Sequence, residues 1–562
     1  MKQYRIYILF LLVFFLNKPT YSQLQSGEIR KSLEERREVY VSLKLSDLKK
    51  HILPYELPGF DRIHDERIYL YLNERDSVFL KQFSGLLQHS VAPSMIRRVK
   101  MSDDREEVLS GRAYPTYSLY LEIMEYFRDN FPEKCSIDTI GYSINERLLL
   151  AARLGYHKDY FDDYPVGFYS STMHGDETLG YVLMLMLINH MLEGEDPAAE
   201  ELMEKMVILI NPLENPDGTY FLSDTTVFGS TRGNAIGVNL NRNYPDPQDG
   251  ENPDGFPRQP ESQAMMNYLL QTKPDISANF HGGAEVVNYP FDTWSYLHAD
   301  DAWFRFISSE YAKLASLLLS GYMDDFPGGI TNGYQWYEVN GGRQDYVTYF
   351  LRGRETTIEL SNVKLLPENE IRSHWEANRQ PMIYYLRQGL YGIHGMVKDS
   401  LDGNPIKAEI ILADHDIYNS SVYSDSVSGK FYRFLKEGSY DVKVEAENYQ
   451  STIIPGISIQ DYELRNMVIS LLPLDFFPEE TAIRVGPNPF DEELYFYLEL
   501  ERPGTVFIKI YDIYGMERLH LFRSFQGGSN EYSFSPDLPP GVYILKVSAG
   551  DMEKKIKIFK IR

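Results

Sequence analysis

The 562-residue chain is short of cysteine, of cationic side chains and of long apolar runs. Cys135 is its only cysteine, so no intramolecular disulfide can form. Lysine and arginine number 56 against 81 aspartates and glutamates, which gives a formal net charge of −25. A surplus of this sign disfavours nucleic acids and anionic membranes as partners. The composition is otherwise globular, with 43% hydrophobic and 24% charged residues, so three or four packed domains are expected.

A sizeable apolar run lies at the beginning of the chain. Lys2 and Arg5 precede the apolar run at residues 6–16, which Thr-Tyr-Ser follows at 20–22. This is the pattern of a secretory signal peptide over residues 1–22, and the run is too short to span a bilayer. We therefore expect an exported protein, secreted or at a cell surface, without a transmembrane anchor. An exported chain without disulfides also indicates a bacterial host.

Residues 23–110 are rich in charge and predict a small α+β unit. Alternating residues at 39–45 and 67–72 predict strands, and a helix start is expected between them. Such a unit is either an inhibitory propeptide or a structural prefix, and its sequence is compatible with both. The charged stretch at the end of this region, residues 101–111, is predicted to be a linker.

From residue 113 to residue 390 the pattern changes to helices that alternate with buried strands. Such alternation predicts an α/β domain, with one sheet covered by helices on both faces. Ligands bind at the carboxyl ends of the strands in such sheets. The expected helices are 118–131 and 179–192, and the expected strands are 136–140, 148–154, 166–171, 206–210, 275–280 and 356–360.

His174, His281 and Glu359 all lie at or near the ends of these strands, as a single site would require. His174 and Glu177 are spaced so that both leave one face of a helical turn, and a third nitrogen ligand would complete a hydrolytic zinc site. Alone, a His-x-x-Glu pair is a weak signal, and His281 on an apolar strand would ordinarily be a core histidine. Glu359 is a stronger candidate, because burying a carboxylate inside an apolar strand is costly unless it has a partner or a function.

Four stretches together strengthen this interpretation: 174–177 (HGDE), 231–245 (TRGNAIGVNLNRNYP), 277–283 (SANFHGG), and 329–359. In their order and spacing they resemble the zinc metallocarboxypeptidases, specifically the N/E-type (regulatory) branch, over about residues 114–390. The resemblance implies a mixed-sheet α/β/α catalytic domain with one Zn²⁺, held by His174, Glu177 and His281. It leaves one coordination position for water. Asp176 stands where the family often has asparagine, and is not expected to be a ligand.

The same resemblance implies catalytic and carboxylate-binding roles. Glu359 matches the general base, which takes the proton of the water and returns it to the leaving amine. Arg232 matches the residue that stabilises the tetrahedral oxyanion. Asn241 and Arg242 match the pair that grips the C-terminal carboxylate of the substrate, for which a guanidinium fork is well suited. Arg232 and Arg242 would otherwise be ordinary surface arginines.

Further matches concern the substrate side chain. Tyr337 matches the mobile tyrosine that covers the substrate carboxylate, with Tyr334 and Tyr346 as alternatives. Asp292 matches the aspartate that binds a C-terminal Lys or Arg, and Gln344 matches a second residue of that pocket. A carboxylate in a pocket attracts a cationic side chain. The simpler interpretation is that Asp292 is only a turn residue.

Two all-β regions follow the predicted catalytic domain. Residues 391–473 contain short alternating strands separated by turn residues, which predicts a small β-sandwich; they resemble the transthyretin-like domain of this branch. Residues 482–562 predict a second all-β sandwich and resemble the C-terminal sorting domain of the type IX secretion system of Bacteroidetes. That resemblance implies export across the outer membrane, with the secretion machinery as a partner and removal of the domain afterwards as an open question.

The sequence as a whole predicts an exported zinc carboxypeptidase that releases Lys or Arg from the C-termini of peptides or proteins. Three alternatives stay open: a zinc amidohydrolase acting on cell-wall peptides, a deacylase on the same scaffold, and a non-catalytic surface binding protein. Asp292 and Gln344 argue against the first, and the carboxylate grip of Asn241 and Arg242 against the second. Glu359 argues against the third, because a binding protein has no use for a general base.

Overall fold

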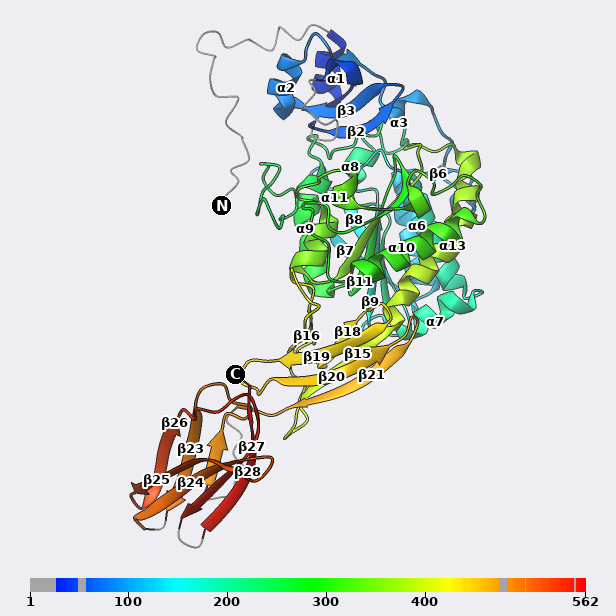
Figure 1. The fold of residues 1–562 in the computed structure, drawn as a ribbon. Coiled ribbons are helices and arrows are strands. Elements are labelled where there is room, and N and C mark those ends of the chain that lie inside the picture. The colour runs from blue at the N-terminus through cyan, green and yellow to red at the C-terminus, as the bar shows by residue number, and fades with distance from the viewer. Residues whose placement is uncertain (1–26, 49–56, 475–482, 501, 550–551, 562) are drawn as a thin grey trace.

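The computed structural model describes residues 27–48, 57–474, 483–500, 502–549 and 552–561. The signal peptide predicted over residues 1–22 lies outside these ranges. Figure 1 shows the N-terminal unit against one end of a central α/β domain and a β-sandwich against the other end. Within the described ranges, no helix combines the length and apolar character needed to cross a membrane.

The N-terminal unit is a small antiparallel sheet with helices. Alternate residues of its strands form a separate core with Leu33 of the first helix, because successive side chains of a strand face opposite sides of the sheet. The helix start expected between its first two strands is a 3-10 turn, Leu45–Asp47. The strand order is β2-β3-β1-β4, with β1 Glu38–Lys44, β2 Phe60–His64, β3 Arg67–Asn73 and β4 Gln88–His89; the helices are α1 Gly27–Arg36, α2 Ser77–Gln82 and α3 Pro93–Ile96.

The central domain is built on one eight-stranded mixed sheet, which confirms the predicted fold class. The strand order is β13-β12-β14-β11-β9-β10-β8-β7, with parallel pairing among β10, β9, β11 and β14. The strands are β7 Cys135–Tyr142, β8 Leu148–Leu154, β9 Val166–Ser171, β10 Val207–Asn211, β11 Ile276–His281, β12 Glu285–Tyr289, β13 Ile330–Asn332 and β14 Arg354–Leu360.

Helices cover both faces of this sheet. Along β10, Ile208 and Ile210 belong to one hydrophobic core while Val207 and Leu209 belong to another, so the strand is buried on both sides. The larger core also contains α5 Tyr117–Asn130, α6 Leu179–Glu193, α7 Pro197–Lys205, α10 Asp301–Ser316 and α13 Glu368–Arg387, and the smaller one contains α9 Pro260–Thr272.

Local sequence signals set the ends of two of these helices. The side chain of Thr116 accepts a hydrogen bond from the backbone N–H of Leu119 at 3.3 Å and caps α5. Gly194 follows α6 with φ of +70°, a conformation that glycine adopts without the steric cost paid by other residues. α6 is apolar on almost every side because it lies between the sheet and other helices.

The predicted linker at residues 101–111 belongs instead to the α/β domain. Met101–Ser102 (β5) pairs with Tyr114–Pro115 (β6), and α4 spans Arg105–Leu109. Val108 of α4 is fully buried in the larger core of the domain. One buried valine in a charged segment was too weak a pattern to reveal this helix. The change from the N-terminal unit to the α/β domain therefore comes ahead of residue 101.

Two seven-stranded β-sandwiches follow, as predicted. In the first, sheets β18-β15-β21 and β17-β16-β19-β20 enclose a core; its strands are β15 Gly392–Asp399, β16 Glu409–Leu412, β17 Val422–Tyr423, β18 Lys430–Arg433, β19 Gly438–Glu445, β20 Thr452–Ile459 and β21 Leu464–Leu471. In the second, sheets β22-β23-β26 and β25-β24-β27-β28 do the same, with β22 Ile483–Gly486, β23 Leu494–Leu500, β24 Gly504–Asp512, β25 Glu517–Phe525, β26 Gly528–Phe534, β27 Gly541–Ala549 and β28 Met552–Lys560.

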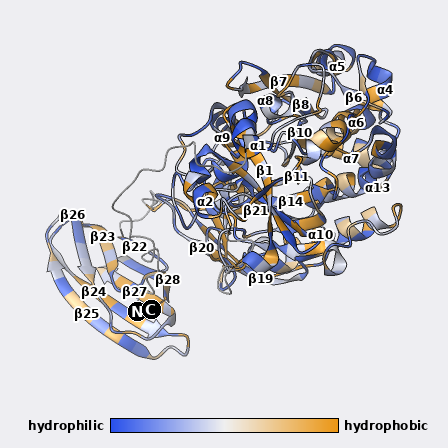
Figure 2. Cartoon of the chain, turned by 90° about the horizontal axis from the view of Figure 1, so that it is seen from above, coloured by the Kyte–Doolittle hydropathy of each residue, from blue (hydrophilic) through white to orange (hydrophobic). Residues whose placement is uncertain are grey.

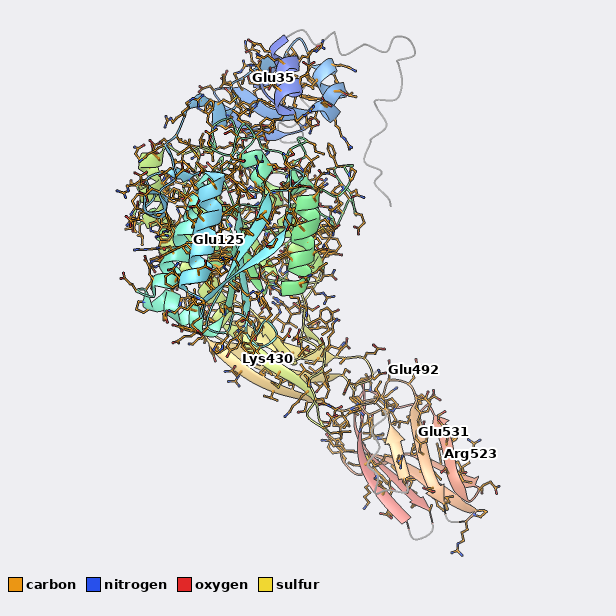
Figure 3. All side chains as sticks on the ribbon, turned by 180° about the vertical axis from the view of Figure 1, so that it is seen from behind. Glu35, Glu125, Lys430, Glu492, Arg523 and Glu531 are labelled. Carbon is orange, nitrogen blue, oxygen red and sulfur yellow. The ribbon has the colours of Figure 1, made fainter. Side chains whose placement is uncertain are left out.

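Along the strands of the β-sandwiches, the residues that face the core are mostly hydrophobic. Hydrophobic and hydrophilic residues alternate along the strands of the last sandwich (Figure 2), with one side of each sheet forming the core. Exposed acidic side chains, among them Glu35, Glu125 and Glu531, belong to three different units (Figure 3). Part of the negative charge is therefore solvated on the surfaces of separate units, while other carboxylates are buried.

Candidate active site

The three predicted metal ligands come together at the carboxyl ends of two central strands. β9 ends at Ser171, and the chain turns through Thr172, whose φ is +63°. His174 and Glu177 lie in the turn that follows, where the N–H of Glu177 donates to the carbonyl of His174 at 3.1 Å. The expected helical turn is therefore a hydrogen-bonded turn ahead of α6. His281 is the last residue of the adjacent strand, β11.

The ligand atoms of this trio converge on one point. The Nδ1 atoms of His174 and His281 lie 3.0 and 2.8 Å from one carboxylate oxygen of Glu177, and 3.1 Å from each other. Tetrahedral zinc with bonds of about 2.0–2.1 Å holds its ligand atoms roughly 3.3 Å apart. Each of the three residues is only 3% exposed, so a dry site of two imidazoles and one carboxylate fits a zinc ion.

Asn239 orients the first imidazole, a role that the sequence did not reveal. Its side-chain oxygen lies 2.9 Å from Nε2 of His174. An Nε2–H that donates to this oxygen leaves the lone pair of Nδ1 for a metal, which is the usual partner arrangement around a ligand histidine. Asn239 lies within the 231–245 stretch, but neither its residue type nor its spacing marks it as a partner of His174.

Glu359 lies beside the trio with a free carboxylate oxygen. In the parallel pairing of β11 and β14, Glu359 is opposite His281. Its Oε2 is buried and makes no hydrogen bond to any residue that the structure describes. Burial, and then the charge of Glu177, raise the pKa of Glu359 well above its usual value. A buried carboxylate of high proton affinity is suited to taking up and returning a proton.

Arg242 of the predicted carboxylate clamp lines a cleft of about 1100 Å³ beside the metal ligands, whereas Asn241 is not among its lining residues. Arg232, Arg242 and Tyr337 all contribute to its wall. Asn241 precedes Arg242 in a short turn, Leu240–Arg242 (η5), and its side-chain oxygen accepts the N–H of Arg343 at 3.0 Å. The amide nitrogen of Asn241 is thereby left as its free donor for a carboxylate.

The cleft distinguishes among the three candidate tyrosines. Tyr334 and Tyr337 both line it, whereas Tyr346 packs into a hydrophobic core against Tyr244 with ring centroids 5.5 Å apart. The arrangement therefore retains Tyr337, with Tyr334 as its neighbour on the same wall.

Asp292 and Gln344 meet in a buried polar cluster. One oxygen of Asp292, Oδ1, accepts the side-chain amides of Asn288 at 3.0 Å and Gln344 at 2.9 Å. Burial raises the pKa of Asp292 to about 7. An added Cβ on Gly333 would lie 1.6 Å from Oδ1 of Asp292, so this glycine provides the space for the carboxylate. Neither Asn288 nor Gly333 was expected from the sequence.

A buried lysine, also missed from the sequence, lies on the other side of the trio. Nζ of Lys364 is 3.2 Å from Glu177, 3.5 Å from Asp176 and 3.0 Å from Asp61 of the N-terminal unit. Its side chain is 2% exposed. The sequence gives only its position, five residues after Glu359, and nothing in that position marks the lysine as buried.

The N-terminal unit docks against this side of the site through polar contacts. The carboxylate of Glu38 accepts the backbone N–H groups of Arg232 and Gly233, at 3.0 and 3.3 Å. The hydroxyl of Tyr71 donates to Asp176 at 2.6 Å. These contacts join segments more than one hundred residues apart in the sequence, so no local pattern predicts them.

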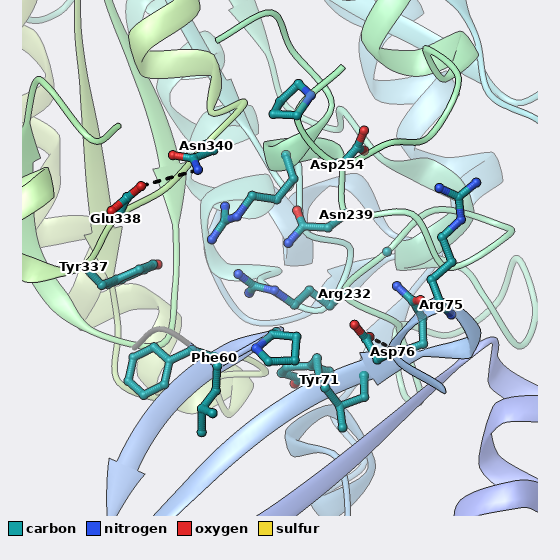
Figure 4. Close-up of a pocket in the computed structure, with 18 of the residues that line it drawn as sticks. Phe60, Tyr71, Arg75, Asp76, Arg232, Asn239, Asp254, Tyr337, Glu338 and Asn340 are labelled. Carbon is teal, nitrogen blue, oxygen red and sulfur yellow. Dashed lines mark hydrogen bonds between the residues drawn. The ribbon is translucent and has the colours of Figure 1, made fainter. Parts of the chain in front are cut away.

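Aromatic rings continue the contact along the cleft. Phe60 packs against Tyr337 with ring centroids 5.6 Å apart, and the guanidinium of Arg232 lies 5.7 Å from the ring centre of Tyr71. Figure 4 shows Phe60 and Tyr71 on one wall and Arg232 and Tyr337 opposite. One wall of the cleft thus comes from the N-terminal unit and the other from the α/β domain.

Comparison with known proteins agrees with this geometry. The profile of the zinc carboxypeptidase family matches residues 120–381. Carboxypeptidase M of Mus musculus is 32% identical over 350 residues, which cover 58% of this chain and 78% of that protein. The catalytic chain of carboxypeptidase N of Rattus norvegicus is 30% identical over 400 residues, 62% of this chain and 85% of that protein. The chain belongs to the zinc carboxypeptidases, a family of metal-dependent hydrolases.

Other similar proteins are longer or more distant. Carboxypeptidase D of Mus musculus is 33% identical over 360 residues, which cover 60% of this chain. The chain spans only about a quarter of the length of that relative, since 25% of it is covered. Among solved structures, carboxypeptidase A from Helicoverpa armigera has a TM-score of 0.47 at 15% identity, with 62% of this chain and 97% of that one covered.

Proposed function

We propose that this protein is an exported zinc carboxypeptidase that hydrolyses the last peptide bond of a chain and releases Lys or Arg. The observation that carries the proposal is a combination within one site. The ligand trio and Glu359 lie beside a cleft that presents Arg242. The buried carboxylate of Asp292, which accepts the amides of Asn288 and Gln344, lies within electrostatic range of Arg242. A carboxylate clamp next to an acidic pocket suits the end of a chain whose last side chain is cationic.

The chain's own residues divide the reaction among them. His174, Glu177 and His281 hold the metal, and bound zinc supplies Lewis acidity and a water of lowered pKa. Glu359 accepts the proton of the attacking water and returns it to the leaving amine. Arg232, which donates to Glu177 at 2.8 Å without substrate, is placed to donate to the carbonyl oxygen as that oxygen gains negative charge.

Hydrolysis of two blocked dipeptides, one ending in Arg and one in Phe, tests this function. We expect release of Arg, little release of Phe, and loss of both with a zinc chelator. E359Q keeps the shape of the side chain but cannot accept a proton. Its kcat should therefore fall by roughly 10²–10⁴-fold with zinc still bound. Release of Phe in preference to Arg would retain the enzyme and reject the pocket assignment.

The alternative functions predict different results in the same assay. A zinc amidohydrolase or a deacylase would leave both dipeptides intact and cleave amide or acyl substrates without a free terminal carboxylate. A non-catalytic binding protein would bind peptides and cleave nothing, even with zinc present. Arg242 and Asp292 favour the carboxypeptidase, because neither alternative reaction requires both a carboxylate clamp and an acidic pocket.

For the N-terminal unit we propose an inhibitory role, because it contacts Arg232 and Lys364, which in turn contact the metal ligand Glu177. Glu38 occupies the N–H groups of Arg232 and Gly233, and Asp61 pairs with buried Lys364. A polypeptide that approaches the metal from this side would have to displace these contacts. Removing one partner of a buried charge pair costs about 3–5 kcal/mol, so such contacts hold the unit firmly in place.

Weakening the docking contacts tests the inhibitory role. In the double variant E38Q/D61N of the full chain, both anchoring charges are lost. We expect kcat/KM for the Arg-ended dipeptide to rise at least tenfold, because the unit then separates from the site more often. E35Q, on an exposed position of α1, is the matched control and should change nothing. An unchanged kcat/KM in the double variant would identify the unit as a structural prefix.

The remaining units keep the roles implied by their sequences. The sandwich at residues 391–473 is proposed to be a transthyretin-like stabilising or interaction module. The sandwich at residues 482–562 is proposed to be a secretion sorting domain, with export to the surface or the medium. Fractionation of a Bacteroidetes host that expresses the chain with and without residues 482–562 tests this, and export of both forms equally would contradict it.

A further inference from the structure

A second carboxylate lies directly behind the specificity pocket. Asp345 is fully buried at the end of the short helix α12, Arg343–Asp345. Its two oxygens each lie 3.0 Å from the backbone nitrogen of Asp292, and one accepts the N–H of Thr293 at 2.8 Å. It therefore fixes the backbone from which the side chain of Asp292 extends, without lining the cleft.

The same short helix holds Asp292 from two directions. Gln344 donates its amide to the carboxylate of Asp292, while the next residue, Asp345, accepts the backbone N–H of Asp292. The helix is itself fixed, because Arg343 lies between the buried carboxylates of Glu214 and Glu355 at 2.9 and 3.0 Å. The short helix α12 thus sets both the position and the direction of the Asp292 carboxylate.

This arrangement leaves one oxygen of Asp292 for a ligand. Oδ1 receives both side-chain amides, and Oδ2 forms no hydrogen bond with any residue in the described part of the chain. Asp292 and Asp345 are both buried and repel each other, so a cation that enters beside Asp292 is favoured. A Lys or Arg side chain supplies that cation.

We propose that Asp345 is a positioning residue for the basic-side-chain pocket and sets the preference for Arg over neutral residues. The proposal rests on the proposed function, and it deepens it by assigning specificity to a residue that does not touch the substrate. Asp345 acts through Asp292, so its loss should affect recognition of the cationic side chain and leave the chemical step intact.

The variant D345N tests the proposal, because an amide keeps one acceptor oxygen and turns a donor toward the backbone N–H groups. We expect KM for the Arg-ended dipeptide to rise about tenfold to hundredfold, with kcat and both constants for the Phe-ended dipeptide changed less than twofold. D345E keeps two acceptors displaced by one methylene and should restore part of the preference. If D345N fails to fold, as judged by zinc content and circular dichroism, D345E alone should show a smaller rise in the same KM.

D275N is the matched control. Asp275 likewise accepts a backbone N–H, that of Val166 at 2.8 Å. It directly precedes β11, however, and His281 lies at the other end of that strand. The same chemical change there should leave the KM for the Arg-ended dipeptide unaltered.

Calorimetric binding of free L-arginine and L-leucine to the full chain distinguishes a failure of the Asp345 assignment from a failure of the basic pocket. Preference for arginine in the native chain and its loss in D345N would support the assignment. Preference retained in D345N, with unchanged KM, would overturn the role of Asp345 and leave the proposed function standing. No preference in the native chain would reject the basic pocket, and the role of Asp345 with it.

Discussion

Single residues decide what this site can do, and the two buried carboxylates beside the ligands illustrate how. Glu359 and Asp292 are both buried, and burial raises the pKa of each. The consequence differs with the partner: Glu359 has a free oxygen next to the metal ligands, whereas Asp292 receives two amide donors. One carboxylate is thereby suited to proton transfer and the other to recognition of a cation.

The pH dependence of substrate binding should report on Asp292. Its pKa of about 7 means that the carboxyl group takes up a proton as the pH falls through 7, and the neutral form does not attract a cation. We expect KM for an Arg-ended dipeptide to rise as the pH drops from 8 to 5.5, approaching about tenfold per pH unit. KM for a Phe-ended dipeptide should not follow this curve. Steady-state kinetics across that range provides the measurement, and parallel curves for both substrates would refute the assignment.

At the scale of elements, the carboxyl ends of β9, β11 and β14 bring the site together, and the short segments around them shape it. Gly333 begins α11, Gly333–Trp336, directly opposite the carboxylate of Asp292. The element has to start with a residue that lacks Cβ, because any side chain there would occupy the position of the Asp292 oxygen.

The variant G333A should therefore damage the pocket selectively. Its Cβ would lie 1.6 Å from Oδ1 of Asp292 and 2.7 Å from Cγ, so the carboxylate has to move. We expect KM for the Arg-ended dipeptide to rise at least tenfold, with zinc content unchanged. G85A, where an added Cβ meets no atom within 4 Å, is the matched control. An unaltered KM in G333A would show that the carboxylate adapts without loss.

The sequence predicted the elements better than the contacts between them. Length and flanking residues separate the short apolar strand β10, which ends at Asn211 before Pro212, from the longer apolar helix α6. The ligand trio follows from its motifs. Lys364 and Tyr71 could not be predicted as partners of the site, because their positions depend on how two separate units dock. The helix α4 was missed because only two adjacent residues of a charged segment, Val108 and the partly buried Leu109, pack against the core.

At the scale of the whole molecule, Asp300 joins the peptidase domain to the first β-sandwich. Its carboxylate accepts Arg354 of β14 at 2.7 Å and Arg433 of β18 at 2.9 Å, and His415 lies 2.9 Å away. These groups could be mistaken for a metal site, since Asp300, His415 and Asp416 cluster together. Two buried guanidinium groups already balance the charge of the cluster.

Removing the charge of Asp300 should uncouple the two units. In D300N, Arg354 and Arg433 are left buried without a full counter-charge, which costs about 3–5 kcal/mol. We expect scanning calorimetry to show a lower first transition and a separate second one. D414N, an exposed aspartate of the same sandwich, is the control and should melt like the native chain. A single unshifted transition in D300N would contradict the coupling.

The cleft is bounded by two units with separate hydrophobic cores, one contributing Phe60 and Tyr71 and the other Arg232, Arg242 and Tyr337. The width of the cleft is therefore set by how the two units dock, and not by the packing within either core. When the two bodies part, the entrance widens while the strands that hold the ligands keep their packing. Access to the metal and the stability of the catalytic domain can thus change independently in evolution, where a substitution falls on a side chain of the N-terminal unit such as Phe60, which belongs to neither core of the α/β domain.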